Sequence, residues 1–406
     1  MSLKQELGRS VSRFGKIILL LASLHSLTGC DSQLERFDSN EVFALTLAKS
    51  ESVDTRKAQA DVSQILESLF GTPDNPVWPA DYPAEQLVVS DRLRRAAGNI
   101  SSDQDGMHLG LFREHCVVCH AVEGSGSGPA SQFQNPYPRD FRPGVFKWKS
   151  TQRAAKPTRA DLKNLLVKGI PGTGMPSFSL LEDDDLEALV DYVIYLSVRG
   201  ETERRLLMTA IMSLGYGSED LRDNERLRWP GDEQTREVVD ETLQRVIQPW
   251  VASDDEVSDA ASSSIDQFKL DDSESIAKGK ELFHGKIANC VGCHGTNGGG
   301  GLETLDYDDW TKEYTTKLGL SPSDKESVQP FREVGAHRPR PIQPRKIRGG
   351  VFRAGAEPQR LFRLITQGIA GTPMPGVALV QEENGKGLTA SQVWDLVNYL
   401  RSLQDD

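Results

Sequence analysis

Hydrophobic residues recur with helical spacing in several segments of the chain. In the segment from about 31 to 100, apolar residues fall at i, i+3, i+4 and i+7, which is one face of a helix (Val62, Ile65, Leu66 and Leu69). Gly71, Pro73 and Pro76 follow and predict the end of that helix. A second stripe ends near Pro249 (Val238, Val239, Leu243, Val246 and Ile247). We therefore expect a helix in each of these two segments.

The N-terminus has the pattern of an export signal. A basic stretch that ends at Lys16 precedes an apolar run over residues 17–24, which is far shorter than the ~20 residues that cross a bilayer as a helix. The run closes with Leu27-Thr28-Gly29-Cys30, which resembles the bacterial lipoprotein box. This resemblance implies removal of residues 1–29 and lipidation of Cys30. Ordinary cleavage near Gly29 and an uncleaved signal anchor are the alternatives.

Two parts of the chain repeat the same features in the same order. Each has a Leu-Phe pair, a CxxCH motif, a Pro-Arg segment, a glycine-rich loop with a Met-Pro pair, and a closing apolar helix. The first has Leu111-Phe112, Cys116-Val117-Val118-Cys119-His120, Pro138-Arg139, Met175-Pro176 and Leu189-Val190-Asp191-Tyr192-Val193; the second has Leu282-Phe283, Cys290-Val291-Gly292-Cys293-His294, Pro344-Arg345, Met374-Pro375 and Leu396-Val397-Asn398-Tyr399-Leu400. This order indicates an internal duplication.

The duplication divides the chain into segments. We call residues 104–200 the first unit and residues 272–406 the second unit. Residues 1–29 are the expected signal peptide, and 30–103 a helical spacer region. Residues 201–271 are expected to be a helical insert followed by an acidic, serine-rich stretch (252–264), whose composition predicts a flexible linker.

The CxxCH motifs are signals for covalent attachment of haem c. Two thiols three residues apart lie on one side of a helical turn, where they reach the two vinyl groups of one porphyrin. The following histidine (His120 or His294) then lies beneath the ring and can bind the iron. A zinc site and a thiol redox pair are the competing interpretations. Zinc ligands usually lie close in sequence, whereas Cys116 and Cys290 are far apart, and a redox pair does not require the trailing histidine twice.

Met175 and Met374 are the candidates for the sixth iron ligand. The chain has only six methionines, and these two occupy the same position in both repeats, before a proline and after a glycine-rich turn. A lone methionine is more often a core residue. His337, in an extra stretch of the second unit, could compete with Met374, although an exposed loop histidine is the simpler interpretation. His108, His115 and His284 lie too near their own CxxCH motifs to reach the opposite face.

This layout resembles the class I cytochrome c family, over most of residues 104–200 and 272–406. The resemblance implies a mainly α protein with two all-α domains in tandem, each with one covalent haem c and its iron. It implies thioether bonds at Cys116, Cys119, Cys290 and Cys293, proximal ligands His120 and His294, and distal ligands Met175 and Met374. In the family a proline carbonyl often accepts from the proximal histidine, and Pro129 is the candidate in the first unit. Propionate contacts or solvated charges are the two interpretations of Arg139, Arg142, Arg345 and Arg348, with Trp148.

Charge and cysteine count agree with this picture. The 406 residues carry a formal net charge of −12, which disfavours nucleic acid. The acidic surface would either steer the protein toward basic partners or simply keep an exported protein well solvated. There are five cysteines: four belong to the CxxCH motifs and Cys30 to the expected lipid anchor, so none is left for a disulfide. The hydrophobic content of 37% is that of an ordinary globular protein and not of a multi-span membrane protein.

These patterns predict an electron carrier and not an enzyme. We expect a dihaem cytochrome c on the periplasmic side of a bacterial membrane, lipid-anchored or secreted into the periplasm. It would pass single electrons between a donor and an acceptor of a respiratory or other membrane-associated chain. A dihaem cytochrome c peroxidase and a haem c subunit of a dehydrogenase or oxidase complex are the alternatives. The peroxidase would require one haem with an open distal side, which the duplicated Met-Pro loops disfavour.

Overall fold

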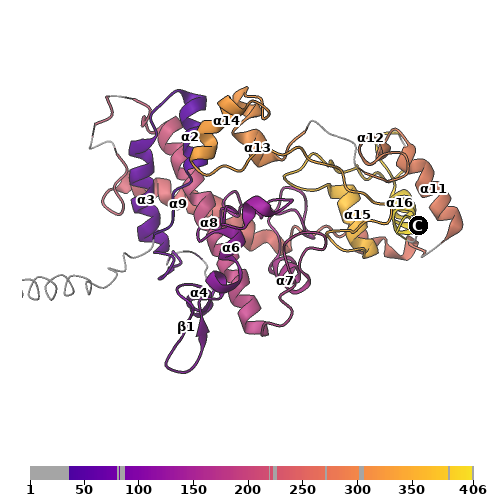
Figure 1. Cartoon of the computed structure of the whole chain (residues 1–406), viewed down its shortest axis with the longest axis horizontal. Coiled ribbons are helices and arrows are strands. Elements are labelled where there is room, and N and C mark those ends of the chain that lie inside the picture. The colour runs from indigo at the N-terminus through magenta and orange to yellow at the C-terminus, as the bar shows by residue number, and fades with distance from the viewer. Residues whose placement is uncertain are drawn as a thin grey trace, which may run out of the picture. The chain divides into compact units, whose positions relative to one another are not determined.

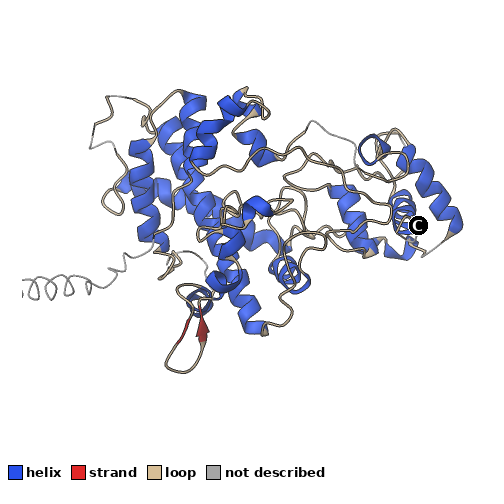
Figure 2. Ribbon diagram, in the orientation of Figure 1, coloured by secondary structure: helices blue, strands red, loops and turns tan. Residues whose placement is uncertain are grey.

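In the computed structural model, residues 36–79, 82, 87–218, 220–222, 226–269, 272–300, 306–382 and 385–404 are described. Their regular structure is almost entirely helical (Figure 2), which confirms the mainly α prediction. Within these ranges the only strands are β1 (Ser101–Ser102) and β2 (His108–Leu109), which pair antiparallel. The expected signal peptide and Cys30 lie outside the described residues.

Three helices precede the first CxxCH motif: α2 (Glu41–Glu51), α3 (Arg56–Phe70) and α4 (Ser90–Ala96). The side chain of Asn40 accepts a hydrogen bond from the backbone N–H of Phe43 (3.2 Å) and caps the start of α2. The predicted stripe on α3 is buried, and the helix ends at Gly71, which has a positive φ of 70°. All three helices pack against α8 (Figure 1).

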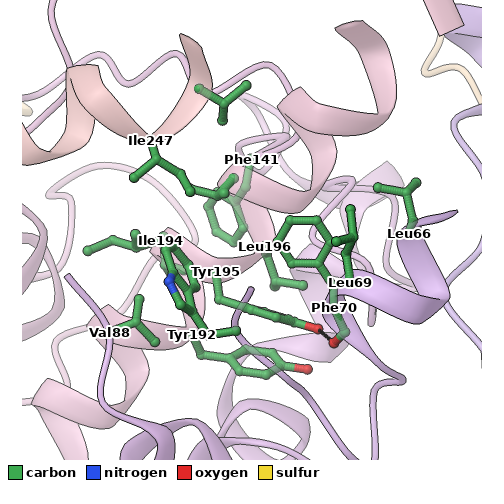
Figure 3. Packing of buried hydrophobic residues seen from close by; sticks show 14 of the residues in the cluster. Leu66, Leu69, Phe70, Val88, Phe141, Tyr192, Ile194, Tyr195, Leu196 and Ile247 are labelled. Atoms are coloured by element: carbon green, nitrogen blue, oxygen red, sulfur yellow. Dashed lines mark hydrogen bonds between the residues drawn. The ribbon is translucent and has the colours of Figure 1, made fainter. Parts of the chain in front are cut away.

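Helix α8 (Asp183–Ser213) is the central helix of this part of the molecule. It contains the closing helix expected for the first unit, but it continues without a break beyond residue 200 into the insert. Tyr192 and Tyr195 are buried at its centre (Figure 3), and the Tyr195 hydroxyl donates to the carbonyl oxygen of Phe70 on α3 (2.5 Å). One apolar core therefore joins the spacer region, the first unit and the insert.

The first unit also contains short helices that frame its motifs. They are α5 (Leu111–His115), α6 (Val117–His120), η2 (Ser131–Phe133) and α7 (Arg159–Lys168). Helix α7 begins with a capping box between Thr158 and Asp161. It ends at Gly169, whose positive φ of 63° lets the chain turn directly into the Met175 loop.

The insert is helical, as expected, but its serine-rich end is not a flexible linker. It comprises α9 (Glu233–Val251), η4 (Ala252–Asp254), α10 (Ala260–Ser263) and η5 (Ile265–Gln267). Ala261 is fully buried, and the hydroxyl of Ser264 accepts a hydrogen bond from the indole N–H of Trp394 (3.0 Å). The stretch is folded because its small side chains fit against the core of the second unit, which composition alone does not reveal.

The second unit has its own core around two packed helices, α11 (Ser273–His284) and α16 (Ala390–Ser402). Their close approach requires glycine at Gly279, where a Cβ would lie 2.0 Å from the carbonyl oxygen of Asp395. Trp394 is buried between the rings of Phe362 (4.5 Å) and Phe268 (5.2 Å). The other elements are α12 (Val291–His294), α13 (Asp309–Glu313), η6 (Thr316–Leu318), α14 (Lys325–Glu333) and α15 (Pro358–Gln367).

The extra stretch of the second unit, expected from about Glu303 to Arg338, is described from residue 306 and packs against the first part of the chain. Tyr314, Val328 and Phe331 form a small apolar cluster with Val42 and Leu45 of α2. By its contacts the chain from Phe37 to Asp406 is one compact unit. Among the described helices, none combines the length and apolar character needed to cross a membrane.

Candidate functional site

The first CxxCH motif is held by the buried pair that precedes it. Leu111 and Phe112 are anchored in the core, where the Phe112 ring lies 4.9 Å from that of Tyr192 on α8. From Cys116 the chain makes one helical turn, in which the backbone N–H of His120 donates to the carbonyl oxygen of Cys116 (2.9 Å). This turn places both thiols and the imidazole at one end of a cavity.

The ring of His120 is fixed from two directions. Its Nδ1 lies 3.0 Å from the carbonyl oxygen of Arg139, and its face stacks on Phe141 at 4.6 Å. A carbonyl can only accept, so Nδ1 carries the proton and Nε2 keeps its lone pair. Burial also lowers the pKa of His120 to about 4, which keeps the ring in the neutral form that binds metals.

This arrangement corrects one expectation and explains the duplicated Pro-Arg segment. The carbonyl that accepts from His120 belongs to Arg139 and not to Pro129. In the second unit the Nδ1 of His294 lies 2.9 Å from the carbonyl oxygen of Arg345. Arg139 and Arg345 occupy the same position in the two repeats, so the segment serves in both units to orient the histidine.

The Met175 loop is a tight turn held by its own backbone. The N–H of Ile170 donates to the carbonyl oxygen of Met175 (3.1 Å), and the N–H of Met175 donates to the hydroxyl of Thr173 (3.1 Å). These bonds leave the thioether side chain free to face the cavity, which it lines.

Cys116, Cys119, His120 and Met175 all line one cavity of the first unit. It has about 1210 Å³ of empty space, counting the part open to solvent, and its walls are mainly apolar. A porphyrin fits this set of groups: two thiols for its vinyl groups, an imidazole and a thioether for its iron, and an apolar wall for its faces. The structure thus brings together in one cavity the four residues that the sequence predicts as the haem ligands and attachment points of the first unit.

The second unit repeats the same local geometry. The N–H of Ile369 donates to the carbonyl oxygen of Met374 (3.2 Å), and the N–H of Met374 donates to the hydroxyl of Thr372 (3.3 Å). Before this loop, Gly368 has a φ of 66°, close to the 63° of Gly169. The second CxxCH turn closes with a bond from the N–H of His294 to the carbonyl oxygen of Cys290 (2.8 Å). The CxxCH turn and the methionine loop of the second unit are therefore built like those of the first unit.

Comparison with known proteins identifies the family. The Cytochrome c family matches residues 110–197 and 276–404, which together make up more than half of the chain. The chain belongs to the cytochrome c family. It is a tandem cytochrome c with two haem-binding regions, each of which carries a covalent haem c with its iron.

Comparison with solved structures finds a similarity between one of them and this cytochrome c. That structure is a chain of the reducing HAO-like protein complex of Kuenenia stuttgartiensis, with a TM-score of 0.44 and 20% sequence identity, over 75% of this chain and 99% of that one. No curated protein matches the sequence.

Cys116 and Cys290 do not have the character of redox thiols. Burial raises the pKa of the Cys116 thiol to about 12 and that of Cys290 to about 11, whereas reactive thiols have a lowered pKa. The two CxxCH motifs also belong to different apolar clusters, so they do not form one shared zinc site.

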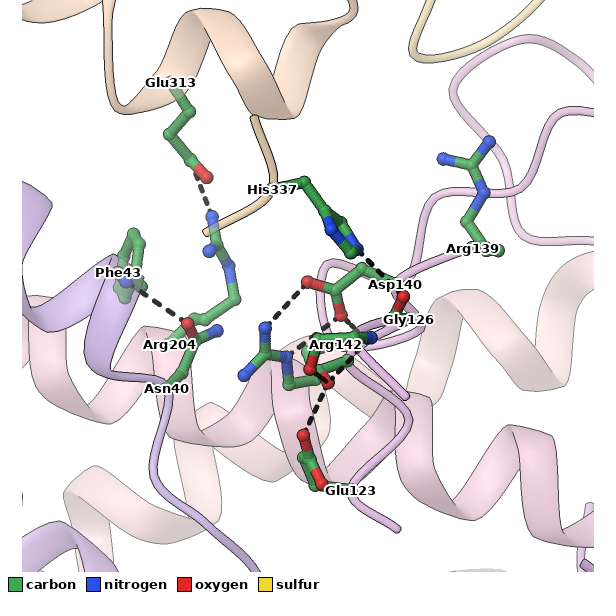
Figure 4. A network of polar contacts seen from close by, with 12 residues as sticks. Asn40, Phe43, Glu123, Gly126, Arg139, Asp140, Arg142, Arg204, Glu313 and His337 are labelled. Carbon is green, nitrogen blue, oxygen red and sulfur yellow. Dashed lines mark hydrogen bonds and ion pairs between the residues drawn. The ribbon is translucent and has the colours of Figure 1, made fainter. Parts of the chain in front are cut away.

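The other histidines named from the sequence have local roles. His108 pairs with Glu114 (2.5 Å), and both ring nitrogens of His284 face backbone carbonyls. His115 lines the first cavity beside Cys116. His337 is partly buried: it stacks on Tyr137 (4.1 Å) and its Nε2 lies 2.9 Å from the carbonyl oxygen of Gly126 (Figure 4).

The arginines named from the sequence separate into two groups. Arg139 belongs to the group that lines the first cavity, and Trp148 lines the same cavity. Arg142 instead forms a bidentate pair with Asp140 (3.0 and 2.9 Å; Figure 4), and Arg348 donates to the carbonyl oxygen of Asn297 (3.2 Å). Sequence reasoning did not identify Lys147 and Arg353, which also line this cavity. Lys147 and Arg353 each follow a Val-Phe pair at the same position of the two repeats. This correspondence is the sequence signal by which they could have been identified.

Proposed function

We propose that this cytochrome c is a dihaem electron carrier in which both irons have a histidine and a methionine ligand. His120 and Met175 would bind the iron of the first unit, and His294 and Met374 that of the second. The protein would pass single electrons between redox proteins of a respiratory or other membrane-associated chain.

The observation that carries this proposal is the shared cavity of the first unit, lined at once by two thiols, a neutral imidazole and a thioether. The support extends to the second unit because the same hydrogen bonds orient His294 and hold the Met374 loop. Haem c supplies a one-electron iron couple, and a methionine ligand raises its reduction potential.

The residues of the chain would restrict this couple to electron transfer. With an imidazole and a thioether both bound to the iron, no position would be left for peroxide or another small molecule. The carbonyl of Arg139 and the ring of Phe141 hold His120 in one orientation, which limits structural change when the charge of the site changes. The apolar walls, among them Leu166 and Val190, exclude water from the faces of the ring.

The location and partners form the second part of the proposal. The lipoprotein-like sequence that ends at Cys30 supports a lipid anchor on the periplasmic side of a bacterial membrane. The net charge of −12 favours donor and acceptor proteins with basic docking surfaces. A Cys30→Ser variant should be released from the membrane fraction, and the mass of the wild-type mature chain should include a lipid at Cys30. A mature wild-type chain without this added mass would contradict the anchor.

The proposed ligation is tested by a redox titration followed by magnetic circular dichroism. The expected result is two one-electron steps, both with the spectrum of histidine–methionine haem, and the weak charge-transfer band of a Met–ferric iron bond. Rapid binding of cyanide to either ferric haem, together with turnover of hydrogen peroxide, would instead support the dihaem peroxidase. Stoichiometric co-purification with a dehydrogenase or oxidase would place the protein in a complex as a fixed subunit.

A further inference from the structure

The cavity of the first unit is lined by three cationic side chains and by no aspartate or glutamate. Arg139 and Lys147 come from the first unit, whereas Arg353 comes from the second. This excess of positive charge is local, because the chain as a whole carries a net charge of −12. It therefore requires an explanation in the cavity itself.

In the part of the chain that the structure describes, no acidic side chain lies within ion-pair distance of the three cations. Among the described residues, none of their side chains makes a hydrogen bond or an ion pair, and the Nε of Arg353 is buried without an acceptor. Arg139 and Lys147 both lie against the ring of Trp310 in the second unit, at 4.1 and 4.9 Å from its centroid. A ring face stabilises a cation but does not neutralise it.

Burial without an anion is unfavourable for these groups. Desolvation lowers the pKa of Lys147 to about 7 and the pKa values of Arg139 and Arg353 to about 10. Asp308 attracts both Arg139 and Lys147, Asp140 also attracts Arg139, and Asp309 also attracts Lys147, but none of these three carboxylates lines the cavity. The side chain of Asp308 instead caps α13 by accepting from the N–H of Thr311 (2.9 Å). The cluster is thus suited to a ligand that brings more than one negative charge.

We propose that the second unit completes the haem site of the first: Arg353, with Arg139 and Lys147 held against Trp310, binds the two carboxylates of the porphyrin in the first unit. This inference rests on the proposed haem ligation. Guanidinium groups bind carboxylates through paired, charge-assisted hydrogen bonds, and the unpartnered Arg353 is free to do so. The site would therefore be incomplete without the second unit.

Contacts in the opposite direction show that the two units share their sites. Arg153 of the first unit donates to the carbonyl oxygens of Met374 (2.7 Å) and Thr372 (2.9 Å) in the distal loop of the second. Each unit thus reaches the loop or cavity of the other, and the reduction potential of the first haem becomes dependent on how the second unit is docked.

The test is a redox titration of the full-length holoprotein carrying Arg353→Gln. Loss of a positive charge beside the ring favours the ferric state. The reduction potential of the first haem should therefore fall, while that of the second haem stays unchanged. The same fall should occur in a Cys290→Ala/Cys293→Ala chain, which holds only the first haem. Arg353→Lys keeps the charge and should restore most of the potential. Arg245→Gln removes an exposed charge on α9 (68% exposed) and should change neither potential.

A second readout separates charge from folding. The propionate bending bands in the resonance Raman spectrum should shift in Arg353→Gln and in Lys147→Gln, with circular dichroism unchanged. Equal potentials and Raman bands in Arg353→Gln and Arg245→Gln would overturn the inference. The proposed function would still stand in that case if the wild-type protein titrates in two one-electron steps. A wild-type protein without reversible one-electron steps would contradict the proposed function itself.

Discussion

The two cytochrome c units use the same local bonds in different surroundings. In each, a Pro-Arg carbonyl orients the histidine and a threonine hydroxyl holds the methionine loop. The first unit shares one large core with the spacer helices and the insert, and Cys116 is buried in it. The core of the second unit is smaller, and Cys290, the equivalent of Cys116, is only partly buried.

The shared bonds and the different surroundings affect different properties of the two haem sites. The repeated bonds fix the type of ligation, and therefore one-electron chemistry in both units. Burial and nearby cations both disfavour the extra positive charge of ferric iron. We therefore expect the first haem to have the higher reduction potential, so that electrons move from the second unit to the first.

The largest expected effect is loss of a haem. Cys116→Ala/Cys119→Ala and Cys290→Ala/Cys293→Ala should each leave one of the two haems, because each pair of thiols attaches one porphyrin. The first variant should also lose more thermal stability, since its empty cavity opens into the shared core. Intact-protein mass and a thermal melt measure both quantities. Retention of two haems in either variant would contradict the assignment.

The next effect is a change of reduction potential. Met175→His and Met374→His should each lower one potential, by a substantial part of the about 0.8 V over which axial ligands can set it. The step of higher potential should move in Met175→His, and the step of lower potential in Met374→His. The opposite assignment in the redox titrations would reverse the expected direction of electron flow.

A smaller effect concerns the buried ion pair of the first core. Lys156 and Glu201 are paired at 2.6 Å, so Lys156→Met should leave a buried carboxylate alone and reduce the free energy of unfolding by about 3–5 kcal/mol. Burial already raises the pKa of Glu201, so its charged form destabilises the fold as the pH rises, and the loss should shrink toward low pH. Denaturant unfolding at several pH values measures it.

The control for this variant lies in the second unit. Lys278→Met removes the exposed pair with Glu274 on α11 and should leave the unfolding transition unchanged. A similar loss of stability in both variants would mean that the buried pair of the first core has no special role.

The smallest effect concerns the contact between the units. Arg153→Gln removes charged hydrogen bonds worth about 1.5–3 kcal/mol each to the Met374 loop, so the Met–iron bond of the second haem should weaken. Titration of the ferric protein with imidazole should show tighter binding at that haem alone. Lys168→Gln, which breaks the exposed inter-unit pair with Glu357 (2.7 Å), is the matched control and should show no change. Equal affinities in the two variants would remove any role for Arg153.

The sequence predicted the helices, the duplication and the residues that meet in the first cavity, because these have periodic or motif signatures. It did not predict Arg139 and Arg345 as partners of the histidines. A backbone carbonyl can come from any residue, so only the fold shows which one accepts. It also missed Arg353, because contacts between distant segments leave no local pattern. The serine-rich stretch near Ser264 was misread because composition does not show what surface lies beside it.

The unbroken helix α8 limits how this protein can be divided. A chain that ended at residue 200 would be cut in the middle of α8, and the buried residues beyond that point, such as Leu206 and Leu207, would be lost. The family match ends at residue 197, but the folded structure around it does not. The first haem-binding region could therefore not be cut out at residue 200 without also removing part of the core that stabilises it.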